Sequence, residues 1–189
     1  VIHPLLSRQP LYDVQQFSLI SMLATAPMLL MVPGHSKWQR LQDFLQEARD
    51  LPGKLNFGSP GYGSSLHLAM EILMAKSGVQ LTHIPFSGSQ PALTALVSGE
   101  IQAYFDLLPS AKPFMGAGRL RAIATTARHR MVTAPDIPTF FEQGLDENFV
   151  SPRFVLIAPG GLSPNVVQQI NLDVSNILSD KHLRDRFEA

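Results

Sequence analysis

One segment of the chain combines glycines and serines in a way that suits anion binding. It reads Phe-Gly-Ser-Pro-Gly-Tyr-Gly-Ser-Ser over residues 57–65. It follows an expected strand over 54–59 and precedes an expected helix that starts near Ser64 or Ser65. Glycines let a backbone turn sharply and expose N–H groups, and a helix N-terminus adds unpaired donors with partial positive charge. With the hydroxyl of Ser59, the segment predicts an anion site without a fixed cation. An ordinary turn with a serine cap is the alternative.

Two familiar phosphate-binding loops do not fit this segment. Ser64 stands where a P-loop requires lysine, although Gly58 and Gly63 have the right separation. Leu66 stands where a dinucleotide-binding fingerprint requires its third glycine. The sequence therefore excludes these two nucleotide-binding motifs.

Asp106 is a second candidate for ligand contact. It ends an expected strand over 101–106, and the carboxyl ends of parallel strands form the ligand crevice of open α/β sheets. Asp106 is thus placed to receive a donor from a ligand. Its alternative is a capping role before Pro109.

The histidines do not form a metal motif. No two of the six have the close spacing of a helical metal pair, and the chain has no cysteine. His67 can hydrogen-bond near the glycine loop, and His83 is interpreted as structural. A hydrolase could use Ser59, His67 and Asp106, but no Gly-x-Ser-x-Gly elbow occurs. We expect no metal, no cofactor and no catalytic residue.

Short strands alternate with helices along the chain, which is typical of βαβ units and a largely parallel sheet. Ser36 and Gln39 have the spacing of a capping box and predict a helix that ends at Pro52-Gly53. The other elements are expected as strands over 81–85, 120–126 and 153–158 and as helices over 65–77, 90–98, 109–115, 139–143, from Pro164 to 178 and over 180–189.

Composition narrows the function classes. The 189 residues include 15 Lys+Arg and 15 Asp+Glu, so the net charge is zero and the electrostatic footprint of a nucleic-acid-binding protein is missing. Hydrophobic residues make up 45%, which excludes a disordered chain. No apolar run reaches the roughly 18–20 residues of a membrane span, so we expect no membrane insertion. The chain opens with Val1 and is expected to be part of a longer protein.

Several short sequence segments, taken in their order along the chain, resemble those of the Bug family, the periplasmic substrate-binding proteins of tripartite tricarboxylate transporters. The resemblance covers about residues 10–180. The segments are Pro-Gly-Lys-Leu-Asn-Phe-Gly-Ser-Pro-Gly-Tyr-Gly-Ser-Ser-Leu-His-Leu at 52–68, His-Ile-Pro-Phe-Ser-Gly at 83–88, Gly-Glu-Ile-Gln-Ala at 99–103, Gly-Arg-Leu-Arg-Ala-Ile-Ala at 118–124, Pro-Asp-Ile-Pro-Thr at 135–139 with Glu142 and Gly144, and Ala-Pro-Gly at 158–160 before Pro164.

This resemblance implies an α/β fold of the type II periplasmic binding protein class, with two α/β lobes and mostly parallel sheets. Residues 1–27 would form part of lobe 1 and the first crossing, 28–151 lobe 2, and 152–189 the return to lobe 1. Lobe 2 would be complete and lobe 1 partial. The first crossing is expected near 26–32 and the second near 150–154.

The resemblance also implies a function without chemistry. The protein would capture a small carboxylate in the periplasm and deliver it to the membrane permease subunits of a transporter. The loop would hold one carboxylate, and Asp106 would accept a hydrogen bond from the other end of the ligand. The expected ligand-binding residues are Ser59, Gly61, Tyr62, Gly63, Ser64, Ser65 and Asp106.

Some positions depart from the family pattern. Phe86 and Ser87 stand where Tyr and Lys are common, and Arg153-Phe154-Val155 replaces an aromatic–aromatic–glycine pattern. The strand and Pro/Gly-rich loop with which members usually begin are missing from this sequence. Two other readings stay open: an α/β hydrolase-like enzyme with a Ser/His pair, and a truncated paralogue that binds no ligand.

Overall fold

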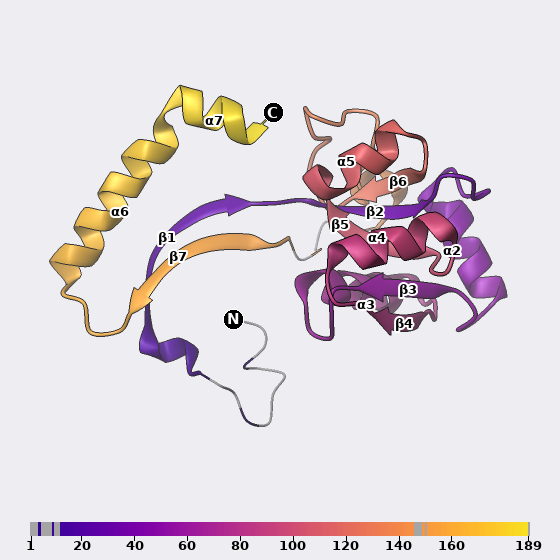
Figure 1. Cartoon of the computed structure of the whole chain (residues 1–189), viewed down its shortest axis with the longest axis horizontal. Coiled ribbons are helices and arrows are strands. Elements are labelled where there is room, and N and C mark those ends of the chain that lie inside the picture. The colour runs from indigo at the N-terminus through magenta and orange to yellow at the C-terminus, as the bar shows by residue number, and fades with distance from the viewer. Residues whose placement is uncertain (1–3, 5–8, 10–11, 146–148, 150, 189) are drawn as a thin grey trace. The chain divides into compact units, whose positions relative to one another are not determined.

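The structure is a computed structural model that describes residues 4, 9, 12–145, 149 and 151–188. The chain divides into two compact units (Figure 1). Unit 1 comprises Val1–Ala26 and Pro152–Ala189, and unit 2 comprises Pro27–Ser151. Each unit is described by itself below.

Unit 2 is built on a five-stranded sheet with the order β4-β3-β5-β2-β6. The parallel pairs are β3 with β4 and β3 with β5, whereas β2 is antiparallel to both β5 and β6. Four strands therefore run in one direction and β2 opposes them, so the expectation of a mostly parallel sheet needs one correction: the sheet is mixed. The strands are β2 Met28–Pro33, β3 Asn56–Ser59, β4 Thr82–Pro85, β5 Ala103–Leu107 and β6 Leu120–Thr125.

The helices of unit 2 cover both faces of this sheet (Figure 1). Strand β4 lies beside β3 on one side in the sheet, and β5 lies beside β3 on the other. The connections β3-α3-β4 and β4-α4-β5 therefore run in opposite directions across the sheet. Because such crossovers are right-handed, they place α3 and α4 on opposite faces. Helix α5 contacts α4 and shares its face. The helices are α2 Leu41–Asp50, α3 Ser65–Ser77, α4 Ser89–Ser98, α5 Leu108–Gly116 and the 3-10 turn η2 Phe141–Gln143.

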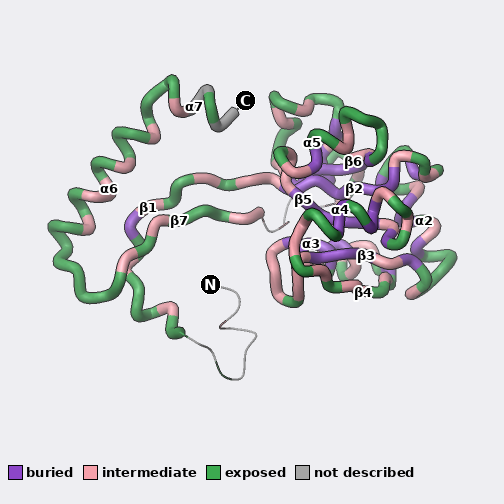
Figure 2. The backbone as a smooth tube through the Cα atoms, in the orientation of Figure 1, coloured by how far each residue is buried: buried purple, intermediate pink, exposed green. Residues whose placement is uncertain are grey.

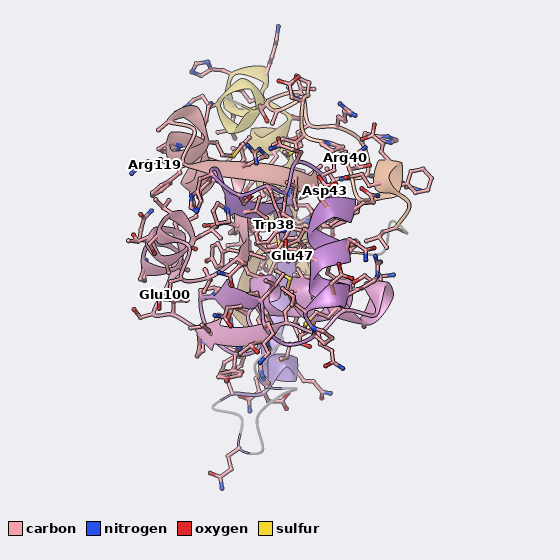
Figure 3. All side chains as sticks on the ribbon, turned by 90° about the vertical axis from the view of Figure 1, so that its right-hand side faces the viewer. Trp38, Arg40, Asp43, Glu47, Glu100 and Arg119 are labelled. Atoms are coloured by element: carbon pink, nitrogen blue, oxygen red, sulfur yellow. The ribbon has the colours of Figure 1, made fainter. Side chains whose placement is uncertain are left out.

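The start of α2 differs from the expected capping box at Ser36 and Gln39. The helix begins at Leu41, and the Asp43 carboxylate accepts hydrogen bonds from the N–H groups of Gln39 (3.0 Å) and Arg40 (2.9 Å). These bonds hold the pKa of Asp43 below its usual range. Figure 3 shows Asp43 beside Arg40, with Trp38 and Glu47 next to each other below them.

The segment before α2 is not helical because a half-buried cation, Arg121, holds its carbonyl groups. The Arg121 guanidinium donates to the carbonyl oxygens of Gly34 (3.1 Å), Ser36 (3.2 Å) and Trp38 (3.0 Å). Carbonyls engaged in this way are turned toward one side chain and cannot form a helical ladder. These hydrogen bonds join the segment to β6. Because β6 is distant in sequence, local patterns do not predict the contact.

Strand β2 forms the centre of the hydrophobic core. All six of its residues are buried, so it reads as a continuous apolar run rather than an alternating one. Aromatic side chains of β3, β5 and the 3-10 region, including Phe57, Phe105 and Phe140, are fully enclosed with it. In Figure 2 the buried residues of unit 2 concentrate along β2, β5 and the helix faces turned toward them.

Unit 1 pairs two strands that the sequence separates by more than a hundred residues. Strands β1 (Phe17–Thr25) and β7 (Arg153–Pro159) are antiparallel and directly pair Leu19 with Ile157. Its helices are η1 Val14–Gln16, α6 Pro164–Ser179 and α7 Lys181–Glu188. The predicted start of α6 at Pro164 is confirmed, with Ser163 as its N-cap. Strand β1 was not expected from the sequence, and its pairing with β7 contains two register shifts.

Apolar side chains of unit 1 are largely exposed. Among its described residues, Ile20 is the one hydrophobic side chain in the buried class. Figure 2 shows both strands and α6 mainly as exposed or intermediate. Exposed apolar residues on its strands are Leu19, Met22, Phe154, Val155 and Ile157. An apolar surface of this kind favours association.

We predict that Gly34→Ala destabilises unit 2. A Cβ at Gly34 would lie 2.1 Å from the carbonyl oxygen of Gly118, and backbone atoms must shift to relieve that clash. The free energy of unfolding should fall by about 1–3 kcal/mol. Urea titration monitored by the fluorescence of Trp38, the single tryptophan, measures it. Gly116→Ala is the matched control: it meets nothing within 4 Å and should stay within about 1 kcal/mol. Equal urea midpoints for the two variants would contradict the prediction.

We predict that the 189-residue chain self-associates through unit 1. The paired side chains of Leu19 and Ile157 are 64% and 48% exposed. Sedimentation velocity at several concentrations should show a concentration-dependent species, and Leu19→Lys with Ile157→Lys should reduce it. Val132→Lys is the control, because Val132 is an exposed apolar residue of unit 2. A wild-type chain that sediments as a monomer at every concentration would show that this surface does not associate.

Candidate functional site

Three strands of unit 2 end at the same edge of the sheet, here called the carboxyl edge. Ser59 at the end of β3 pairs with Pro85 at the end of β4, and β5 ends next to them at Leu107. The Phe86 N–H donates to the Ser59 carbonyl (2.8 Å) and joins the loops that follow β3 and β4. Because each of these strands leads into a helix, α3, α4 and α5 all begin at this edge.

The three helix N-termini differ in how they are capped. The Ser64 hydroxyl accepts from the His67 N–H (3.1 Å) and caps α3, the role that the alternative interpretation of this segment gave to a serine. Helix α4 begins after Gly88, which adopts φ 136°, and α5 begins after Leu107; neither start has a side-chain cap. Helix N-termini carry partial positive charge and unpaired N–H groups, so this edge favours an anion.

Ser59 lies beneath the glycine loop and is fully buried. Its hydroxyl donates to the Gly61 carbonyl (3.0 Å), accepts from the Gly61 N–H (3.1 Å) and lies 2.7 Å from Nε2 of His83. The single proton of this hydroxyl is therefore directed to the loop itself. Its bonds are all used to shape the loop.

Two histidines support the same loop from below. The Gly63 N–H donates to Nδ1 of His67 (3.2 Å), and Nε2 of His67 lies 3.3 Å from the Glu71 carboxylate. The rings of His67 and His83 are 4.2 Å apart between centroids. Burial, together with the neighbouring His67, lowers the pKa of His83 from 6.5 to about 4. At neutral pH His83 is therefore uncharged.

Aromatic rings enclose the histidine pair on two sides. Phe57 stacks on His83 with ring centroids 4.8 Å apart, and the ring of Tyr62 meets His83 edge-on at 4.6 Å. Tyr62 is itself 74% exposed. Its exposed face lies on the solvent side of the loop, where a ligand can reach it.

Asp106 is buried at the end of β5, with 2% of its surface exposed. Its Oδ1 accepts from the Leu107 N–H (2.8 Å) and lies 3.5 Å from the Ser89 hydroxyl, which in turn accepts from Tyr104 Oη (3.0 Å). Its Oδ2 is buried without a partner among the described residues. Burial raises the pKa of this carboxyl, against the opposing effect of the Leu107 and Ser89 bonds. Asp106 thus contacts the first residue of α4, Ser89, and the residue that precedes α5, Leu107.

The residues considered for a hydrolase do not assemble. Ser59 contacts His83 rather than His67, and the Asp106 contacts are Leu107 and Ser89 rather than a histidine. A fully buried hydroxyl also cannot attack a substrate. Within the described part of the chain, no group of three or more His, Asp or Glu side chains could hold a metal ion.

The predicted site residues therefore divide into two groups. Gly61, Tyr62, Gly63, Ser64 and Ser65 lie together on the loop and the start of α3, whereas Ser59 and Asp106 lie beneath the carboxyl edge. Sequence analysis missed the role of His83 in this site, along with Tyr104 and Ser89. The register of β3 on β4 would have identified His83, because it pairs His83 with Phe57, two residues before Ser59.

A surface hollow beside α2 is not part of this site. Its lining includes Lys37 and Leu51, which lie between the end of β2 and the start of β3, at the opposite edge of the sheet. Its acidic side chains are already engaged: Glu47 binds Trp38 and Lys37, Asp43 caps α2, and Asp50 accepts from Gln46. This hollow offers no unpaired charge to a ligand.

Comparison with known proteins places the chain. A family model described as "Tripartite tricarboxylate transporter family receptor" matches residues 2–184. A Pseudomonas protein, "UPF0065 protein in tcbD-tcbE intergenic region", is 34% identical over 91% of this chain and 52% of its own length. A Cupriavidus necator protein, "UPF0065 protein in gbd 5'region", is 37% identical over 84% of this chain and 48% of its own. The chain thus spans about half the length of these relatives.

Solved structures of similar proteins share the fold. An R. palustris protein solved with adipate is 30% identical, with a TM-score of 0.83 over 93% of this chain and 59% of its own. MatC from Rhodopseudomonas palustris, solved with bound malate, is 30% identical, with a TM-score of 0.78 over 90% of this chain and 58% of its own. The periplasmic binding protein BugD has a TM-score of 0.78 at 24% identity over 91% of this chain and 57% of its own. The type II binding-protein fold expected from the resemblance is confirmed.

The family model covers nearly the whole chain, and the relatives include Bug proteins by name. The resemblance found in the sequence is confirmed: the chain belongs to the tripartite tricarboxylate transporter receptor (TctC) family.

Proposed function

We propose that this chain captures a small carboxylate as the receptor of a tripartite tricarboxylate-type transporter. The observation that carries the proposal is the carboxyl edge of unit 2, where a glycine loop and two helix starts without side-chain caps meet. Such an edge supplies N–H donors and partial positive charge without a fixed cation. The two solved relatives described above carry adipate and malate, which are dicarboxylates.

The ligand's carboxylate lies, in this proposal, against the outer face of the loop. The backbone of Gly61 and Gly63, the ring of Tyr62 and the hydroxyl of Ser65 are the contacting groups. Ser64 contributes through its backbone, because its hydroxyl caps α3. Ser59 and Asp106 stay in the site as positioning residues, since both are buried and hydrogen-bonded to the loops that carry the contacts.

The protein performs this task without chemistry. We take residues 28–151 as lobe 2 of a two-lobed receptor, with 1–27 and 152–189 as parts of lobe 1, and place the receptor in the periplasm with permease subunits as its partners. Among the described residues, no helix has the length and apolar character that a membrane span requires. A Ser/His enzyme receives no support from the geometry: Ser59 does contact His83, but its hydroxyl is fully buried and bonded to the loop, and the contacts of Asp106 are Ser89 and Leu107 rather than a histidine.

We predict that the 189-residue chain binds dicarboxylates with millimolar affinity at most. A ligand held at one edge stays largely hydrated, so each charge-assisted hydrogen bond contributes little against the entropy of association, which costs at least about 4 kcal/mol. Titration of the 15N-labelled chain with malate and with adipate should shift the amide signals of Gly61, Gly63 and Ser65. Adipamide, a neutral molecule of similar length, is the control.

Three outcomes would contradict this prediction, each in a different way. Shifts that are equal for adipate and adipamide would remove the carboxylate from the site. A complete lack of shifts at this edge would favour the alternative of a truncated paralogue that binds no ligand. Micromolar binding would show that the affinity resides in the residues of this chain alone.

We predict that Ser65→Ala weakens binding without changing stability. Ser65 is the first residue of α3, and its hydroxyl makes no contact that the fold requires, so alanine is tolerated there. Loss of one half-exposed hydrogen bond to a carboxylate should cost about 0.5–1.5 kcal/mol, roughly two- to tenfold in the dissociation constant. The adipate titration above measures it.

Ser59→Ala is the contrasting variant. It leaves the buried Gly61 N–H and the His83 ring without their partner, so it should lower the free energy of unfolding by about 1–3 kcal/mol and also disturb the loop. A Ser59→Ala chain with wild-type stability but weaker adipate binding would return Ser59 to direct ligand contact.

A further inference from the structure

We propose that His67 and His83 are positioning residues that hold the loop Gly61–Gly63 in its shape only as neutral imidazoles, so that acid releases this loop. The loop part of the inference concerns this chain alone. Its consequence for carboxylate binding rests on the proposed function above.

The hydrogen bonds around Ser59 define the tautomer of His83. The Ser59 hydroxyl has one proton, and donating it to the Gly61 carbonyl leaves the oxygen free to accept from Gly61 N–H and from Nε2–H of His83. This arrangement uses every partner and leaves only an acceptor, Nδ1 of His83, buried without a bond. The opposite tautomer would bury an unpaired N–H, which proteins rarely tolerate.

The contacts of His67 define its tautomer in the same way. The Gly63 N–H points at Nδ1, so Nδ1 must be the unprotonated acceptor. Nε2 then carries the proton and faces the Glu71 carboxylate. Both rings are therefore Nε2–H tautomers, and both use that state to hold one glycine of the loop, His67 directly and His83 through Ser59.

A second proton on either ring breaks this arrangement. On His67 it would turn Nδ1 into a donor facing the Gly63 N–H, and the loop would lose that bond. On His83 it would place a buried N–H⁺ where the described residues offer no acceptor. Each charge would also lie beside the other ring, since the two centroids are 4.2 Å apart.

The groups around the two rings couple the position of the loop to the protonation of the histidines. In the described part of the chain, the ionisable groups that contact either ring are the other histidine, Tyr62 and Glu71. Only Glu71 favours a charged ring, and its side chain is 47% exposed, so water screens it. Tyr62 rests edge-on against both rings, at 5.6 Å from His67 and 4.6 Å from His83. A shift of either ring therefore moves the loop residue proposed to face the ligand.

Nuclear magnetic resonance of the full chain without ligand tests the loop directly. At neutral pH, the 15N signals of both histidines should show the Nε2–H tautomer. Between pH 7.5 and 3.5, a range that includes the His83 pKa of about 4, the amide signals of Gly61 and Gly63 should move together with the histidine signals, and the Gly63 amide should lose protection from hydrogen exchange. An Nδ1–H tautomer at either ring, or glycine signals that stay still while the histidine signals change, would overturn the proposal.

Two conservative variants separate this role from a merely structural one. Asn at position 67 retains an acceptor near the place of Nδ1, and Gln at position 83 retains a donor near the place of Nε2, but neither titrates. The double variant His67→Asn with His83→Gln should keep the Gly63 amide protected at neutral pH and abolish its pH-dependent shift. His67→Phe should lose that protection at every pH. His129→Gln, at an exposed histidine, is the control and should leave the pH-dependent shift of the Gly63 amide as it is in wild type.

Stability gives a second readout of the same protonation. His83 has its ordinary pKa of 6.5 in the unfolded chain and about 4 in the folded one, so the unfolded chain binds more protons between these values. The free energy of unfolding should therefore decrease as the pH falls from about 6.5 to about 4, and His83→Gln should remove this part of the slope.

Adipate titration separates this inference from the proposed function. Between pH 7 and 3.5, which spans the His83 pKa of about 4, affinity should fall about fourfold more for wild type than for the double variant, while protonation of adipate itself affects both equally. If the loop responds to pH but adipate binds nowhere, the proposed function fails, whereas the inference that the neutral histidines hold the loop stands. If adipate binds and both proteins lose affinity equally, protonation of the histidines does not control binding, and the consequence inferred for carboxylate binding fails.

Discussion

The parallel pairing of β3 with β4 and β5 is the constraint on which the candidate site depends. Because this pairing aligns Ser59 with Pro85, the loops that leave both strands start at the same height and are joined by the Phe86 N–H. The helices α3, α4 and α5 then begin side by side in the topology. Partial charges that are weak at one helix N-terminus add up when several meet at one edge.

The opposed strand β2 supports that edge from within the sheet. It lies between β5 and β6, pairs Leu29 with Asp106, and is buried along its whole length. Thr125 and Thr126 at the end of β6 bond back to Met28, which fixes the beginning of β2. A buried strand held at this point gives Asp106 a rigid backbone, and the carboxyl of Asp106 in turn holds the beginning of α5 through Leu107.

Local signals made much of this fold predictable. The bounds of α3 at residues 65–77 and the Pro164 start of α6 were correct, because each is decided within a few residues. The cap of α2 was wrong, since Arg121 from a distant strand holds the preceding carbonyls. In the site, the glycine loop was visible in the sequence. The Ser59–His83 contact was not, because it depends on the register between strands that lie 24 residues apart.

The division of the site into buried and exposed groups bears on what such a receptor can distinguish. Backbone N–H groups and helix N-termini interact with any carboxylate, so they attract the class of ligand without selecting a member of it. Selection requires side chains that face the ligand, because a hydrogen-bonding site rejects a molecule that leaves its buried polar groups unpaired. On this edge Tyr62 and Ser65 are the predicted residues whose side chains are free for that purpose, whereas Ser59, Ser64 and Asp106 are committed to the fold. Exchanging Tyr62 and Ser65 can therefore alter ligand preference while leaving the loop intact, and changes at the buried residues alter the loop first.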